Sequence, residues 1–183
     1  LVLIKLIFIC QGKNNIHEDI KKLSEIMIKD SHNQWNENVI DNTINTGFIL
    51  GRGVGFALSN EISLKFKELC QEMIEPFSSA EVMHGPKSLI QNSFKLFILG
   101  MSDKSGLTVQ QDISELINYT NLVYQMTSDD KLKSKFYYSS NKILELDSVI
   151  LMSKFYPWII RYTLKKGLNP DEPRYLTKVT QTF

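Results

Sequence analysis

The sequence predicts an α/β protein, a three-layer α/β/α sandwich built around a parallel sheet. Two observations predict this fold. Short apolar runs of strand length recur along the chain, and each is followed by a turn and a longer segment with helical periodicity. Strands that alternate with helices pair in parallel, and the helices then cover both faces of the sheet. No linker rich in proline or serine divides the 183 residues, so we expect one domain.

The first 45 residues lack a strand pattern and are predicted to be helical. The opening run LVLIKLIFIC is about half the length of a membrane span and carries Lys5 near its centre, so we interpret it as a buried helix. Residues 17–29 place apolar side chains on one face, which is typical of a surface helix, and residues 33–42 are expected to form a second short helix.

Two strand-turn-helix units follow. Residues 46–50 are an apolar run that ends in a glycine turn at 51–53, and a helical pattern extends over 54–73. Residues 95–100 form a second apolar run, and the polar turn at 102–106 leads into another amphipathic stretch. The repetition of this unit is the main support for a parallel sheet.

The last third of the chain is predicted to hold two more strands and a long helix. The strands are expected at 121–126 and 136–140, and the helix at 147–166. We expect an interruption of this helix near Pro157 and its end at Gly167.

Composition and charge exclude several classes of partner. Lys and Arg number 21 and Asp and Glu number 20, a net charge of +1, which predicts neither a nucleic-acid nor a membrane partner. Cys10 and Cys70 form no CxxC motif or Cys/His cluster, so no metal site is predicted. We interpret both as small buried side chains in a reducing, cytoplasmic compartment.

A row of charged side chains recurs at helical spacing after the glycine turn: Glu61, Lys65, Glu68 and Glu72. Such a row is usually a solvated helix face with ion pairs. A helix that begins at the carboxyl edge of a parallel sheet can also present carboxylates to a ligand. His84 precedes a Gly-Pro turn, but a lone histidine is more often structural than catalytic.

Taken together, these segments resemble the sugar isomerase (SIS) domain family. The motifs G-R-G-x(7)-E-x(3)-K-x-K-E, A-E-x-x-H-G-P and D-x-P-R-x-L-x-K follow one another in order, and the resemblance extends from Gly47 to the C-terminus. The chain looks most like the C-terminal SIS lobe of the glucosamine-fructose-6-phosphate aminotransferases and like the SIS-type glucosamine-6-phosphate deaminases. The resemblance implies a flavodoxin-like sheet in a single SIS lobe.

The resemblance implies catalytic roles for three residues. Glu68 matches the base that moves a proton between C1 and C2 of the sugar, and His84 matches the group that helps to open the ring. In relatives this histidine comes from the adjoining subunit. Lys178 matches a tail lysine that handles the carbonyl or amine. The chemistry is coherent, since aldose-ketose isomerisation needs a carboxylate, an acid/base for ring opening and a cation near the enediolate.

Three more residues match substrate-binding or bracing positions of the family: Glu61, Lys65 and Arg174. The family needs no metal and no nicotinamide, so no cofactor is expected. The implied ligand is a sugar phosphate.

The resemblance also implies that one of two lobes is present. Relatives hold the phosphate mainly with a loop of a first lobe, which should precede residue 1. We therefore expect a helical lead-in at 1–45 that contains the inter-lobe helix, the SIS domain at 46–166 and a catalytic-type tail at 167–183. The turn at 102–106 is a weak alternative phosphate loop. A missing lobe exposes apolar surface, which predicts a homodimer or higher homo-oligomer.

Three functions remain open from the sequence. The first is a phosphosugar isomerase or deaminase that acts on or binds an amino-sugar phosphate such as glucosamine 6-phosphate or fructose 6-phosphate. The second is a non-catalytic, truncated SIS domain that binds a carbohydrate derivative without the phosphate-binding lobe. The third is an α/β interaction domain without a ligand.

Overall fold

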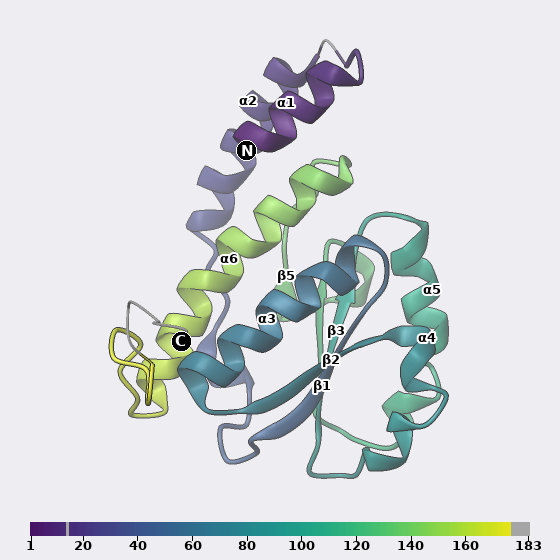
Figure 1. Cartoon of the computed structure of the whole chain (residues 1–183), viewed down its shortest axis with the longest axis vertical. Helices are drawn as coiled ribbons and strands as arrows, with labels where there is room; N and C mark the ends of the chain where they lie inside the picture. The colour runs from purple at the N-terminus through teal and green to yellow at the C-terminus, as the bar shows by residue number, and fades with distance from the viewer. Residues whose placement is uncertain (14, 177–183) are drawn as a thin grey trace, which may run out of the picture.

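The chain forms a parallel sheet between two layers of helices in the computed structural model, which describes residues 1–13 and 15–176 (Figure 1). The strands within these residues are β1 (Thr46–Gly51), β2 (Met73–Ser78), β3 (Lys95–Gly100), β4 (Val123–Thr127) and β5 (Phe136–Tyr137). All neighbours pair in parallel, in the order β2-β1-β3-β4-β5. This is the flavodoxin-like order, so the predicted fold class is confirmed.

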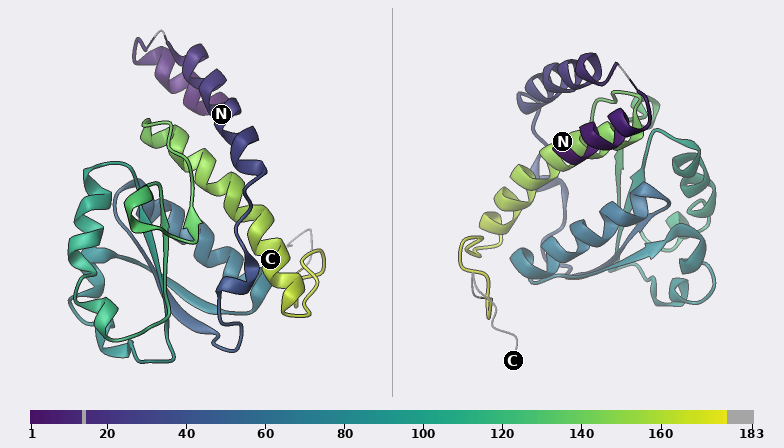
Figure 2. Two further views of the ribbon diagram at one scale, coloured as in Figure 1. Left: turned by 180° about the vertical axis from the view of Figure 1, so that it is seen from behind. Right: turned by 45° about the horizontal axis from the view of Figure 1, so that its top comes forward.

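Helices cover both faces of the sheet, as Figures 1 and 2 show from opposite sides. One face carries α3 (Val54–Cys70) and α6 (Leu144–Lys165), and the other carries α4 (Ser79–Val82) and α5 (Lys104–Asp112). The core is accordingly divided into two apolar clusters, one on each face. Short 3-10 turns complete the described connections: η1 (Glu37–Val39), η2 (Pro86–Leu89), η3 (Leu116–Asn118) and η4 (Asp130–Leu132).

The glycine turn after β1 has a steric cause. A Cβ on Gly51 would lie 2.4 Å from the carbonyl of Gly55, and Gly53 has φ +56°, which L side chains rarely adopt. The two glycines allow the chain to leave the sheet and enter α3 within two residues. Packing and backbone conformation therefore explain the two glycines of the G-R-G segment.

The lead-in helices α1 (Val2–Cys10) and α2 (Ile16–Ser31) extend beyond the sheet (Figure 2). The expectation that the opening helix is buried was wrong, because only one side of α1 packs on the chain. Phe8 is its one buried residue, while Val2 is 83% and Leu3 73% exposed. Cys10 is exposed as well, contrary to prediction, and Cys70 is buried as predicted. None of the described helices combines the length and hydropathy that a bilayer crossing requires.

The helix predicted over 54–73 ends earlier than expected. Gln71 adopts a left-handed conformation with φ 55° and stops α3 after Cys70. The chain then enters β2, a strand that the sequence analysis missed. Pro76 lies within β2, which is tolerated because β2 is an edge strand that pairs only with β1.

The final helix is continuous, although an interruption was predicted. Pro157 lies inside α6, and the helix extends on to Lys165 before Gly167 adopts φ +75°. The buried side chains of Phe155, Trp158 and Ile159 hold α6 against the core on both sides of the proline. Residues 33–42 contain only the single turn η1 where a short helix was expected.

A charged network is buried at the amino edge of the sheet. Lys95 Nζ lies 2.8 Å from Glu72 Oε2 and 2.9 Å from Tyr162 Oη, and all three side chains are fully buried. Lys166 Nζ completes the network 2.7 Å from Glu72 Oε1. The sequence suggested that Glu72 belongs to the exposed row of α3. The structure instead places it after the end of that helix and buries it. Burial lowers the pKa of Lys95, because desolvation of the ammonium outweighs the attraction of Glu72.

Removal of one partner from this network should destabilise the fold strongly. We expect Lys95→Met to lower the free energy of unfolding by about 3 kcal/mol, because it leaves the buried Glu72 with one cation fewer. Urea unfolding followed by circular dichroism measures the change. The matched control is Lys67→Met, which breaks a half-exposed ion pair of the same 2.8 Å length with Glu75 and should cost less than about 1 kcal/mol. Equal effects of the two substitutions would contradict this account.

Candidate functional site

Three of the predicted site residues meet on the outer surface of α3. Lys65 Nζ lies 2.6 Å from Glu68 Oε2 and 3.8 Å from Glu61 Oε1. The three side chains are partly buried, with exposed fractions between 24% and 36%. Helical spacing brings them together, as the sequence predicted, and the result is a carboxylate-ammonium-carboxylate row, which we call the α3 row.

The α3 row has a well-defined charge state. The hydrogen bond and charge of Glu68 raise the pKa of Lys65, against the opposing effect of partial burial. Lys65 is therefore a stable ammonium near neutral pH. Its hydrogen bond occupies Oε2 of Glu68, while Oε1 of Glu68 has no hydrogen-bond partner among the described residues.

The sequence analysis missed Tyr156, which connects the α3 row to α6. Its hydroxyl donates a hydrogen bond to Glu61 Oε1 at 2.9 Å. An exposed tyrosine beside a proline gives no signal of this contact in the sequence, because the partner lies 95 residues away. Partial burial and the neighbouring Glu61 raise the pKa of Tyr156, so it remains a donor at neutral pH.

His84 lies on the other side of the sheet from the α3 row. It follows α4, and its neighbours Val82 and Met83 belong to the apolar cluster beneath α5, whereas α3 packs with α6 on the opposite face. His84 itself is exposed. Within one chain the structure does not bring His84 and Glu68 together.

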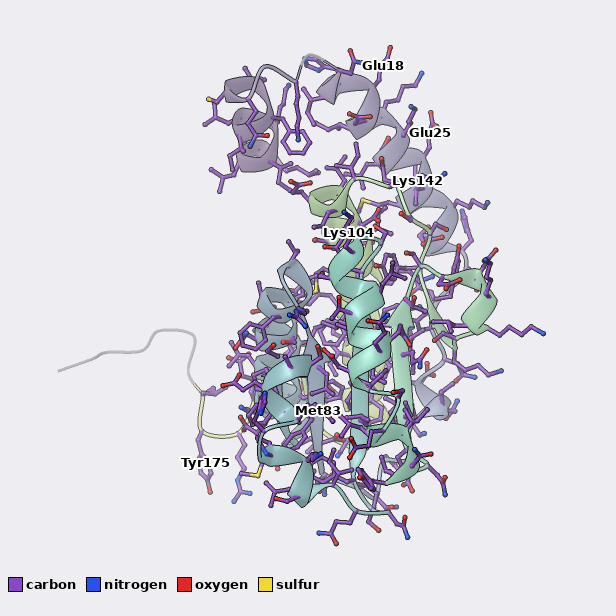
Figure 3. All side chains as sticks on the ribbon, turned by 90° about the vertical axis from the view of Figure 1, so that its right-hand side faces the viewer. Glu18, Glu25, Met83, Lys104, Lys142 and Tyr175 are labelled. Carbon is purple, nitrogen blue, oxygen red and sulfur yellow. The ribbon has the colours of Figure 1, made fainter. Side chains whose placement is uncertain are left out.

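Among the described residues, Arg174 of the tail makes no hydrogen bond or ion pair with the α3 row. Arg174 is exposed and donates from Nη2 to the hydroxyl of its neighbour Tyr175 at 2.7 Å. Figure 3 shows Tyr175 standing off the body of the domain. Lys178 lies outside the described residues, so its predicted role stays a prediction.

The turn at 102–106 lies at the carboxyl edge of the sheet, where it meets the glycine turn. A depression of about 590 Å³ lies here between the loops that follow β3 and β4. Asp103 caps α5 by accepting from the Gly106 N–H at 3.1 Å and from Ser105 Oγ at 2.7 Å. The chain's own carboxylate thus occupies the helix N-terminus that a phosphate would need, which opposes the alternative phosphate loop.

Charged groups bind one another elsewhere along this edge. Arg52 of the glycine turn lies 3.4 Å from Asp112, which also accepts a 2.5 Å hydrogen bond from Ser79. Asp147 is fully buried and accepts from Ser140 Oγ and Asn141 N at 2.5 Å each. In the part of the chain that the structure describes, no group of three or more His, Cys, Asp or Glu side chains is arranged to hold a metal ion.

The chain is similar to known proteins in sequence and in fold. No family model matches the chain. Over 135 residues it is 30% identical to the isomerizing glutamine-fructose-6-phosphate aminotransferase of Sulfurisphaera tokodaii, covering 72% of this chain and 22% of the relative. The chain thus spans about a fifth of the length of the curated relatives it matches.

Solved structures share the fold. The glucosamine-6-phosphate deaminase of Thermotoga maritima superimposes with a TM-score of 0.66 at 21% identity, over 94% of this chain and 52% of that one. The C-terminal domain of glucosamine-fructose-6-phosphate aminotransferase from Francisella tularensis gives 0.67 at 16% identity, over 88% and 48%. At these identities the likeness shows the fold alone.

The fold and the sequence similarity together define a phosphosugar isomerase-type domain. The chain has the fold of the SIS-type domains and is related to the isomerizing aminotransferases.

The ion pair of the α3 row can be tested by titration. We expect Glu68→Gln to lower the pKa of Lys65 toward its ordinary value of 10.5, because the hydrogen bond and charge of Glu68 are the main cause of the raised value. NMR of the lysine side chain measures this. In the native protein the pair stabilises the fold below pH 10.5, and this contribution is lost as the pH rises through the raised pKa. Glu75→Gln, which removes the partner of Lys67, is the control and should leave Lys65 unchanged.

Proposed function

We propose that this domain isomerises or deaminates an amino-sugar phosphate, with glucosamine 6-phosphate and fructose 6-phosphate as the candidate substrate and product. The observation that carries the proposal is the α3 row. It places a carboxylate, one oxygen of which has no hydrogen-bond partner among the described residues, beside the ammonium of Lys65 on the surface of a SIS-type fold. A proton shuttle next to a cation is the requirement of aldose-ketose isomerisation.

In the proposed mechanism Glu68 is the base. Its free Oε1 takes the proton from C2 of the open-chain aldose and returns it to C1, while the ammonium of Lys65 stabilises the charge that develops at the enediolate or enolamine. The resulting C2 imine then reacts with water, which releases ammonia and leaves the ketose. Atoms balance as amino-sugar phosphate plus water giving ketose phosphate plus ammonia. Arg174 would bind substrate and Lys178 would act on the carbonyl or amine from the tail, and no cofactor takes part.

The ring-opening step requires a second copy of the chain. His84 and Glu68 lie on opposite faces of one sheet, so a site that uses both is completed only when His84 comes from a partner subunit. The exposed apolar side chains of α1 are surface that such an assembly would cover. We therefore propose a homodimer or a higher homo-oligomer.

The cytoplasm is the proposed compartment. Cys10 is exposed and Cys70 buried, and neither is part of a disulfide within the described structure. Free thiols are usual in a reducing compartment.

One observation favours a second candidate, a non-catalytic SIS domain that binds a carbohydrate derivative. The N-terminus of α5, which the alternative phosphate loop would use, is already capped by Asp103. A chain without a separate phosphate site would bind sugar weakly and turn it over slowly.

The first experiment measures ammonia and fructose 6-phosphate released from glucosamine 6-phosphate by the purified chain. We expect turnover in the native protein and its loss, by a factor of about 10² to 10⁴, in Glu68→Gln, because the base can no longer accept a proton. Glu75→Gln on β2 is the matched control and should retain activity. Absence of turnover at high protein concentration would favour the non-catalytic candidate.

Mixing of two inactive variants tests the shared site. Glu68→Gln and His84→Asn should each be inactive alone, and an equal mixture that exchanges subunits should recover about a quarter of the native rate, since half of the dimers are mixed and each has one intact site. Sedimentation should show an oligomer at micromolar concentration. A clean monomer, or a mixture that stays inactive after exchange, would refute the shared site.

A further inference from the structure

We infer that Tyr156 is a positioning residue for the proposed catalytic base, because its hydroxyl engages Glu61 and so leaves the ammonium of Lys65 on Glu68. This inference rests on the proposed function. It assigns a role to a residue of α6 that makes no contact with substrate in the proposed mechanism.

The first support is a pairing that runs against helix preference. In isolated helices a glutamate four residues before a lysine is the favoured ion pair, which here is Glu61 with Lys65. The structure keeps this pair but makes the contact with Glu68 the shorter one, since Lys65 Nζ lies 2.6 Å from Glu68 and 3.8 Å from Glu61. An interaction that engages Glu61 would account for the longer of the two distances.

The hydrogen bond from Tyr156 supplies that interaction. Its hydroxyl lies 2.9 Å from Oε1 of Glu61, the same oxygen that faces Lys65. An oxygen that already accepts a hydrogen bond is a weaker competitor for the ammonium. Because its pKa is raised, Tyr156 keeps this donor proton throughout the neutral range.

Packing fixes the direction of the tyrosine. Tyr156 is 41% exposed, yet its ring lines an apolar groove of about 400 Å³ together with Ile4, Leu58 and Met152. The neighbouring ring of Phe155 lies 5.9 Å away between centroids. Since α3 and α6 pack closely, the ring lies beside α3, where its hydroxyl reaches Glu61.

Removal of the Tyr156 hydroxyl should shift the ammonium of Lys65 from Glu68 to Glu61. In Tyr156→Phe, Glu61 is free to take the ammonium in the favoured arrangement, and Glu68 then loses the contact that orients its carboxylate. We expect kcat to fall about tenfold, a part of the 10² to 10⁴ that a positioned base contributes, with little change in KM.

The decisive experiment is a titration of Lys65 by NMR in six proteins, which needs no catalytic activity: the native chain, Tyr156→Phe, and each of these two with Glu61→Gln or with Glu68→Gln. In the native background, Glu68→Gln should lower the pKa of Lys65 and Glu61→Gln should change it less. In the Tyr156→Phe background, Glu61→Gln should lower the pKa of Lys65 more than Glu68→Gln does. An unchanged order overturns the inference, whatever the kinetics.

Tyr119→Phe is the matched control. It removes another tyrosine-glutamate hydrogen bond, 2.7 Å to Glu115, beyond α5 on the other face of the sheet. It should change neither the titration of Lys65 nor kcat. An equal effect of Tyr119→Phe would show a general loss of stability and overturn the positioning role.

The kinetics separate this inference from the proposed function. Native turnover that Glu68→Gln abolishes but Tyr156→Phe leaves intact refutes only the positioning role. If the native protein has no turnover, the proposed function fails, and the titration alone decides whether Tyr156 selects the partner of Lys65.

Discussion

The contact between α3 and α6 is the interaction on which the rest of this domain depends. Phe66 of α3 packs against Trp158 and Tyr162 of α6 at centroid distances of 6.0 and 6.3 Å, and all three rings are fully buried. One face of the sheet is covered by this pair of helices, so burial of apolar area holds α6 in place. The same contact brings Tyr156 to Glu61 and Tyr162 to Lys95.

The two helices therefore contribute to two groups of charged residues, one fully buried and one at the surface. At the amino edge, the buried network of Lys95, Glu72 and Lys166 is fully paired, and such a network favours one arrangement of its elements because any other leaves a charge unpaired. On the outer surface, the α3 row is only partly buried and can exchange partners.

The proposed homo-oligomer rests on the distribution of the candidate residues. Glu68 lies on the face covered by α3 and α6, His84 on the face covered by α4 and α5, and Arg174 on the exposed tail. In the proposed function no single copy holds a complete site. The groove beside Tyr156 includes Ile4 of α1, and Tyr156 contacts Glu61 of the α3 row, so an assembly that covered this groove would cover apolar surface close to the proposed chemistry.

The sequence by itself determined the parallel α/β fold, the helix that carries Glu61, Lys65 and Glu68, and the glycine turn before it. These features are local: periodicity, spacing and the steric freedom of glycine decide them within a few residues. The motifs also led to the SIS class, which the comparisons confirm.

Only the tertiary structure decided the features that depend on contacts between distant segments. The sequence could not show β2, because an edge strand with Pro76 lacks a clear alternation, nor the burial of Glu72, because its partners Lys95 and Lys166 lie 23 and 94 residues away. It placed α1 in the core because its side chains are apolar, yet burial requires a partner surface and not only apolar composition. The hydrogen bond from Tyr156 to Glu61 also joins distant segments, since the packing of α3 against α6 brings the two residues together.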